Sequence, residues 1–225
     1  MKNKSLIILA VVLTTILAFS FTAAAKTTAT VPQFTDVKDT DWYAEPIYAL
    51  SSWDIMVGTS ANTFSPKKEL TRAEFVKVLA NILDEDLSDY EDGDAFSDVP
   101  KGKWYTAPIN WAEDAGIVNG KTPGKFDPFA PITRQELTTM LLRFDGWFFE
   151  GLLDIDDDVI IPLFKDNKQI APWAKEGVDY FVAFEVINGY PDGTFKPKAT
   201  IKRGETAQVV FNYLTSELFS DENSQ

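Results

Sequence analysis

The chain of 225 residues contains no cysteine and no histidine. Without cysteine, neither a disulfide framework nor a thiolate metal site can form. Without histidine, the commonest general base and metal ligand is missing, which excludes most hydrolase constellations but leaves carboxylate pairs open. Basic side chains are also few, with 21 Lys and Arg against 34 Asp and Glu and a net charge of −13. A generic polyanion such as nucleic acid is therefore not an expected partner.

A long hydrophobic run occurs only at the amino terminus, where Lys2 and Lys4 precede an apolar stretch from Leu6 to Phe19. Three alanines then end the segment at residue 25. This order predicts a secretory signal peptide over residues 1–25, cleaved before Lys26. The alternative is an uncleaved anchor, because the stretch is just long enough to span a bilayer. We expect an exported protein with no membrane association after cleavage.

Internal repetition dominates the rest of the chain. The stretch "FTDVKDTDWYAEPIYALSSWDIMVG" at Phe34 has sister stretches that begin at Phe96 and Phe164. A tryptophan, a glycine, a phenylalanine and an arginine recur at common intervals of 62 and 69 residues. These landmarks are Trp42, Trp104 and Trp173; Gly58, Gly120 and Gly189; Phe64, Phe126 and Phe195; and Arg72, Arg134 and Arg203. Three tandem copies are expected to pack as one unit, because one copy cannot bury its apolar faces alone.

Each copy predicts two helices joined by a loop. In the second segment of copy one, Phe75, Val78, Leu79 and Ile82 recur at helical spacing and form one apolar face. The loops hold turn residues, as in "GYPDGTFKP" over residues 189–197. We therefore expect an all-α fold of three helix–loop–helix repeats over residues 34–90, 96–150 and 164–218. Acidic segments at 84–95 and 151–160 lack the spaced frame of a calcium loop and are interpreted as solvated linkers, so no metal or cofactor is expected.

The second helix of each copy begins with an arginine. Thr71 and Glu74 match a capping box, as do Thr133 and Glu136 in copy two. The box does not account for Arg72 and its counterparts, whose charge opposes the positive end of the helix dipole. One interpretation is a surface cation or a partner for a nearby carboxylate. The other is an anion site, in which free amides at the helix start and a bidentate guanidinium meet one acidic group.

At these residues the chain resembles the S-layer homology (SLH) family. The pattern "FTDV…W…MVG…TFSP…LTRAE" and its two sister copies carry the resemblance, from about Phe34 to Glu217. It implies a compact pseudo-threefold assembly with grooves between repeats, which bind secondary cell-wall polymers of Gram-positive-type envelopes, often through pyruvylated amino sugars. It thus implies a non-covalent wall-anchoring module without enzymatic activity, located in the cell wall or S-layer.

The resemblance also implies ligand contacts for particular residues. The arginines are the implied anion contacts, and the glycines with Asn119 and Asn188 line loops that approach the sugar. The tryptophans match the family's aromatic position, although from the residues alone we interpret them first as core. Asp36, Asp98 and Asp166 match the family's aspartate, and loop hydrogen bonding explains them.

Copy three departs from the pattern, since Lys202 replaces the capping threonine and Gly204 weakens the first turn. Copy two is therefore expected to bind best, and Arg134→Ala to weaken binding with little effect on stability. Two alternatives stay open: a structural protein that self-associates into a surface layer, alone or with other S-layer proteins, and a glycan hydrolase with two carboxylates about 5–10 Å apart.

Overall fold

A computed structural model describes residues 33–84, 86–152, 154–155 and 159–219. The predicted signal peptide lies outside these residues. The described residues form six α-helices in three consecutive pairs and no β-strand, which confirms the all-α prediction. The pairs are α2 (Ala44–Ser52) with α3 (Arg72–Leu83), α4 (Thr106–Asp114) with α5 (Arg134–Phe148), and α6 (Lys175–Ala183) with α7 (Arg203–Thr215). Short 3₁₀ turns are η2 (Ser88–Tyr90), η3 (Asn167–Gln169), η4 (Pro172–Ala174) and η5 (Glu217–Phe219).

The first two long helices begin as the sequence predicts. The Thr71 hydroxyl accepts from the Glu74 amide at 3.2 Å, and the Glu74 carboxylate accepts from the Thr71 amide at 2.8 Å. Copy two repeats this capping box before α5. Copy three keeps only the carboxylate half, because Lys202 offers no acceptor.

The glycine in the first turn of α7 has a packing reason. A Cβ at Gly204 would lie 3.1 Å from a ring carbon of Tyr43 and 3.2 Å from the carbonyl oxygen of Pro66. The glycine therefore lets α7 approach repeat one closely, which offsets part of its cost to the helix.

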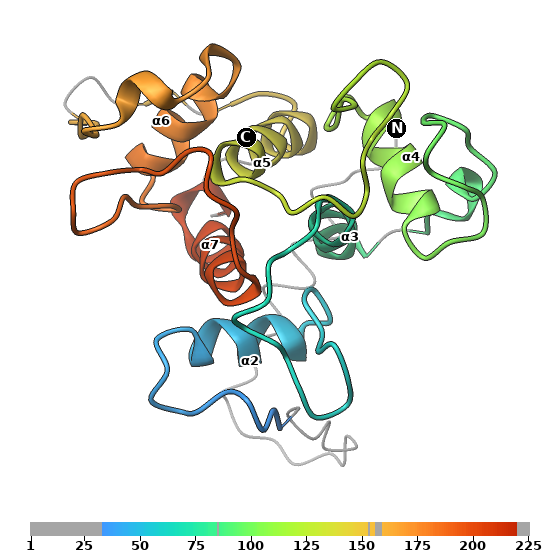
Figure 1. The fold of residues 1–225 in the computed structure, drawn as a ribbon, viewed down its shortest axis with the longest axis horizontal. Helices are drawn as coiled ribbons and strands as arrows, with labels where there is room; N and C mark the ends of the chain where they lie inside the picture. The colour runs from blue at the N-terminus through green and yellow to red at the C-terminus, as the bar shows by residue number, and fades with distance from the viewer. Residues whose placement is uncertain (1–32, 85, 153, 156–158, 220–225) are drawn as a thin grey trace.

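The three repeats exchange helix contacts around a pseudo-threefold centre. Figure 1 shows α3, α5 and α7 around the middle of the molecule and α2, α4 and α6 on its outside. Each outer helix packs on the long helix of the preceding repeat: α4 on α3, α6 on α5, and α2 on α7. Since α2 begins the first repeat and α7 ends the third, the ring is closed. No repeat buries its helices without its neighbours.

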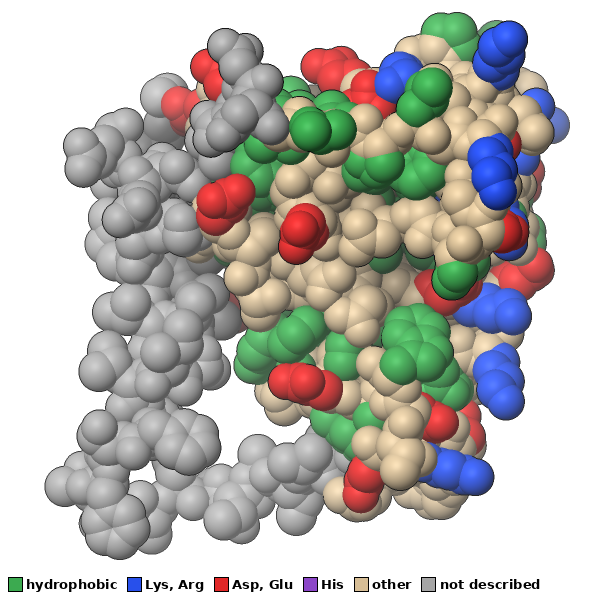
Figure 2. Space-filling model, turned by 90° about the vertical axis from the view of Figure 1, so that its left-hand side faces the viewer, with side chains coloured by type: hydrophobic (Ala, Val, Ile, Leu, Met, Phe, Trp, Pro, Cys, Tyr) green, Lys and Arg blue, Asp and Glu red, His purple; other side chains and the backbone are tan. Residues whose placement is uncertain are grey.

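The surface is unevenly charged. On the face that Figure 2 presents, Lys and Arg side chains gather along the right-hand edge, whereas Asp and Glu are spread over the surface. In a chain with a net charge of −13, such an edge is a local exception. Local charge, rather than net charge, decides which ligands a cleft can accept.

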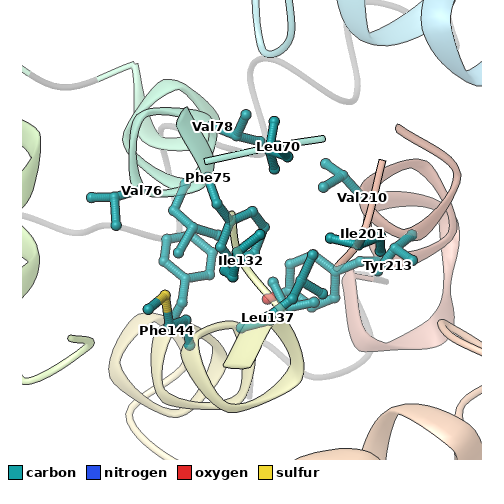
Figure 3. Packing of buried hydrophobic residues seen from close by; sticks show 14 of the residues in the cluster. Leu70, Phe75, Val76, Val78, Ile132, Leu137, Phe144, Ile201, Val210 and Tyr213 are labelled. Carbon is teal, nitrogen blue, oxygen red and sulfur yellow. The ribbon is translucent and has the colours of Figure 1, made fainter. Parts of the chain in front are cut away.

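The shared core fills the space between the three long helices. Phe75 of α3, Phe144 of α5 and Tyr213 of α7 are fully buried and point toward one another in Figure 3. The rings of Phe144 and Tyr213 meet edge to face, with centroids 6.4 Å apart. Burying one such side chain stabilises the fold by about 1.5–3 kcal/mol. The core therefore belongs to the assembly and not to any one copy.

A ring of backbone hydrogen bonds lies beside this core. Just before each long helix, one extended residue pairs with its counterpart in another repeat. The Leu70 amide donates to the Ile201 carbonyl at 3.0 Å, Ile201 to Ile132 at 3.1 Å, and Ile132 to Leu70 at 2.9 Å. All three side chains are completely buried. The pseudo-threefold relation is thus built into the main chain as well as the core.

One buried carboxylate breaks the threefold pattern. Asp145 of α5 is 1% exposed and accepts from the hydroxyls of Tyr180 at 2.9 Å and Tyr213 at 2.7 Å. It links α5 to both helices of repeat three. Burial raises the pKa of Asp145 from 3.8 to about 6, although the two tyrosine hydrogen bonds oppose this shift.

We expect Asp145→Asn to flatten part of the pH dependence of stability. Because the pKa is raised in the folded state, Asp145 makes its full contribution to the free energy of unfolding below pH 3.8. This contribution is lost as the pH rises through about 6. Asparagine does not ionise, so the stability of the variant relative to the native protein should improve by about 2.5 kcal/mol between pH 4 and pH 8. Denaturant unfolding of both proteins at the two pH values measures this. An equal difference at both would contradict it.

Candidate functional site

The helix-start arginine of repeat one is buried against repeat two. Arg72 is 2% exposed, and its Nε donates to the Phe126 carbonyl at 2.9 Å. Its Nη2 donates to the Asn119 carbonyl at 3.3 Å, and its guanidinium lies 4.5 Å from the Phe126 ring centroid. Nη1 forms an ion pair with Glu136 at 3.1 Å. The side chain therefore joins the start of α3 to the loop before α5.

The other two arginines repeat this contact around the ring. Arg134 donates to the carbonyls of Phe195 at 2.8 Å and Asn188 at 2.7 Å. Arg203 returns to repeat one, where it donates to the Phe64 and Val57 carbonyls. Burial lowers the pKa of all three guanidinium groups from its usual value. Each arginine thus fastens its own repeat to the next one, and the third closes the ring.

The amides at the helix starts are also occupied. The Arg72 amide donates to the Ala130 carbonyl at 3.0 Å, and the Ala73 amide donates to Pro128 at 2.9 Å. The starts of α5 and α7 make the same contacts with repeats three and one. The prediction of free amides for an anion was therefore wrong, because the neighbouring repeat supplies their acceptors. Contact between the arginines and an acidic ligand stays a prediction.

The recurring glycines sit where each loop closes on its own repeat. A Cβ at Gly58 would lie 2.6 Å from the Ser60 carbonyl oxygen and 2.7 Å from the Phe34 ring. Gly120 and Gly189 face the same obstruction, from backbone oxygens and from the rings of Phe96 and Phe164. Glycine is needed here for internal packing, and contact with a sugar stays a prediction. Beside two of these glycines, Asn119 and Asn188 present their carbonyls to the arginines.

The recurring aspartates hold the same loops. Asp98 accepts from the amides of Phe126 at 2.9 Å and Asp127 at 2.8 Å. Asp36 and Asp166 accept from the equivalent amides in their repeats. The interpretation as loop hydrogen bonding is confirmed. Each aspartate steadies the phenylalanine carbonyl that accepts from an arginine, so aspartate, glycine and arginine form one structural unit.

The tryptophans are not core residues, which corrects the first interpretation. Trp42, Trp104 and Trp173 are 61%, 54% and 53% exposed. The residue that follows takes the inward position, and in copy two the buried ring of Tyr105 packs edge to face against Trp104. Size and hydrophobicity favoured burial, but each indole lies two residues before its α-helix begins, where the next residue faces inward instead. These rings are free to meet a ligand.

A cleft opens between repeats one and two. It has a volume of about 800 Å³ and lies between α3, the turn η2 and the start of α4. Its walls include two indoles, two lysines, an amide and a proline: Trp53, Trp104, Lys77, Lys103, Asn81 and Pro108. Four carboxylates also line it: Asp54, Asp84, Asp86 and Glu91. Its volume falls in the range of small-molecule sites.

Most residues of this cleft could not be predicted from the sequence. Of the indoles and amine groups in its walls, only Trp104 belongs to the recurring pattern. Lys77 and Asn81 lie on α3, and they share a space with α4 only because that helix packs on the preceding repeat. The available signal was Lys77, a charged residue within the mostly apolar run from Phe75 to Ala80.

Other features of the described residues add little. No cluster of three or more acidic side chains among them could hold a metal ion. None of the helices in the described part of the chain is long and apolar enough to cross a membrane.

Comparison with known proteins gives three matches along the chain. The family model described as "S-layer homology domain" matches residues 33–76, 95–138 and 163–207. The chain is 35% identical over 183 residues to "Exoglucanase XynX" of Acetivibrio thermocellus, covering 80% of this chain and 16% of the relative. It is 31% identical over 155 residues to "Cellulosome-anchoring protein" of the same species, covering 68% of this chain and 34% of the relative. It is 30% identical over 180 residues to "S-layer protein sap" of Bacillus anthracis, covering 79% and 20%.

Proposed function

Because the chain belongs to the S-layer homology domain family, we propose that it is a non-covalent anchoring module of the cell surface. In this proposal the ligand is an anionic, pyruvylated secondary cell-wall polysaccharide attached to peptidoglycan. The protein is exported and resides in the cell wall or S-layer. The chain spans less than a fifth of the glucanases and amylopullulanase that it matches, so their catalytic activities do not transfer to it.

The observation that carries this proposal is the cleft between repeats one and two. Exposed indole faces suit sugar rings, because Trp offers an apolar face and a polar N–H in one side chain. Trp104 supplies one exposed ring, and Trp53 supplies a second that is half-buried and stacks on Phe211. Lys77 and Lys103 supply positive charge beside the rings, among the four carboxylates. The names of relatives, "Cellulosome-anchoring protein" and "S-layer protein", support a surface location.

An enzymatic alternative finds less support. A glycan hydrolase needs one carboxyl kept protonated near neutral pH beside a second that is ionised. Among the described residues, the carboxyl with a clearly raised pKa is that of Asp145, which is buried in the core away from the cleft. In the cleft, hydrogen bonds from Ser88 lower the pKa of Asp86. We therefore propose that the cleft binds its ligand without chemistry.

Co-sedimentation with purified wall sacculi tests the proposed function. The protein should pellet with sacculi that carry their secondary polymer and stay in solution with sacculi from which the polymer has been removed chemically. Free polymer, released from the same sacculi, should compete. Equal retention on stripped sacculi would overturn the proposal, because peptidoglycan itself would then be the ligand.

Self-association into a surface layer is a second candidate function. It is favoured by the similarity to chains named "S-layer protein". Exposed apolar side chains at Ile160 and Leu163, 90% and 83% exposed, offer a contact surface. Light scattering of the exported protein with and without polymer separates the two functions: growth of large particles without polymer indicates self-assembly, and a constant mass indicates anchoring alone.

Trp104→Ala should weaken polymer binding about tenfold while leaving stability nearly unchanged. A tenfold loss corresponds to about 1.4 kcal/mol, within the range for aromatic stacking contacts. Stability should hold because the indole is 54% exposed. Phe129→Ala is the matched control, since that ring is 62% exposed and also packs on Tyr105 but does not line the cleft. Similar losses of affinity in both variants would count against the cleft.

A further inference from the structure

The fourth arginine of the chain stands apart from the helix-start set. Arg143 lies on α5, and its counterparts at the same position of α3 and α7 are Asn81 and Asn212. Asn81 donates to the Ile55 carbonyl at 3.1 Å, and Asn212 donates to the Val186 carbonyl at 3.2 Å. In two copies this position therefore ties the long helix to the loop that follows the outer helix. Copy two has a longer, charged side chain instead.

The pseudo-threefold relation places Arg143 in the space between repeats two and three. Asn81 lines the cleft between repeats one and two, where α4 packs on α3. Because α6 packs on α5 in the same way, Arg143 occupies the position in the second space that Asn81 holds in the first. Trp173, the counterpart of the cleft residue Trp104, is 53% exposed. By the same relation, we expect an indole and a guanidinium to flank this space.

Arg143 has no acidic partner among the described residues. Its side chain is half-buried, and Nη1 lies 3.3 Å from the side-chain amide oxygen of Asn119 in the orientation that satisfies both amide atoms. The described residues include no ion pair with Arg143. Burial lowers the pKa of the guanidinium, and no carboxylate offsets this. A charge that is partly removed from water without a counter-ion is costly, and a bound anion would relieve that cost.

Resting on the proposed function, we propose that Arg143 binds the acidic substituent of the wall glycan in the space between repeats two and three. The three helix-start arginines donate from Nε and Nη2 to backbone carbonyls. Arg143 uses one Nη1 donor on the Asn119 amide oxygen, and its other guanidinium donors keep the planar geometry that matches a carboxylate or a phosphate. In this proposal, repeat two recognises the negative charge of the ligand through Arg143, which lies outside the recurring motif.

Arg143→Asn tests this proposal with a side chain that the fold already accepts at the same position in repeats one and three. The variant should keep its melting temperature, and its Kd for polymer-bearing sacculi should rise about ten- to a hundredfold, as for loss of a charge-assisted contact. Arg143→Lys should lose less, because charge survives without the fork. Lys198→Asn removes an exposed positive charge elsewhere and should leave the Kd unchanged.

The outcomes separate this proposal from the proposed function. If the native protein does not bind polymer-bearing sacculi, the proposed anchoring function itself is overturned. If the native protein binds and Arg143→Asn binds equally well, the assignment of Arg143 is overturned. Sacculi freed of pyruvate ketals by mild acid, and sacculi freed of phosphate, distinguish the two sources of the anion: the defect of the variant should disappear with the group that Arg143 contacts. A defect that persists after both treatments would contradict the proposal.

Discussion

Arg134→Ala is expected to lower the free energy of unfolding by about 3–5 kcal/mol. The substitution leaves the carbonyls of Phe195 and Asn188 without their donors in a buried setting, at about 1–3 kcal/mol each. It also removes the stacking of the guanidinium 4.6 Å from the Phe195 ring centroid. Alanine favours the helix, but by much less than these losses. This reverses the expectation from sequence that stability would hardly change.

Denaturant unfolding of the native protein, Arg134→Ala and Arg134→Lys measures the effect. Lysine keeps a charge but cannot bond both carbonyls and stack on the ring, so its stability should fall between the other two. Binding should be measured well below the lowered melting temperature, so that loss of folded protein is not taken for loss of a contact. An unchanged melting temperature in Arg134→Ala would show that the arginine does not hold the ring together.

Removing the third repeat is expected to abolish cooperative folding of the remainder. A chain that ends before residue 159 loses α6, which covers α5, and α7, which covers α2. It also loses Ile201 from the backbone ring and Arg203, which fastens repeat three to repeat one. The exposed apolar surface would have no partner, and stability in such repeat assemblies depends on the interfaces between neighbours.

Near-ultraviolet circular dichroism during thermal unfolding tests this result. The full chain should show one sharp transition in the aromatic signal, and the shortened chain should show none. Limited proteolysis offers a second measure, since no stable fragment the size of one repeat should accumulate. A resistant, folded fragment of residues 96–144 would contradict the interdependence of the copies.

The sequence predicted the helix pairs of this fold better than the contacts between the repeats. Helical periodicity and the capping boxes are local, so three helix pairs and the starts of α3 and α5 could be anticipated. The acceptor of Arg203 lies 139 residues away in the chain, and nothing near the arginine indicates it. The arginine recurs because three interfaces recur, which a repeat pattern alone cannot distinguish from three ligand sites.

The exposure of the tryptophans and the position of the cleft could not be predicted from the sequence for a related reason. Trp104 and Tyr105 are adjacent and both aromatic, and only the phase of α4 decides which of them is buried. That phase depends on how α4 meets α3 of the preceding repeat. The surroundings of Asn81 and Arg143 could not be predicted either, because the spaces that they occupy exist only between repeats.

The most direct test of ligand binding in the spaces between repeats is a nuclear magnetic resonance titration of the indole N–H signals with released wall polymer. The chain has six tryptophans, each with one such signal. The signals of Trp104 and Trp53 in the cleft, and of their counterpart Trp173, should shift in proportion to bound polymer. Trp111, which is 2% exposed, should stay unchanged. Saturating binding that leaves the signals of Trp53, Trp104 and Trp173 unshifted would contradict the account.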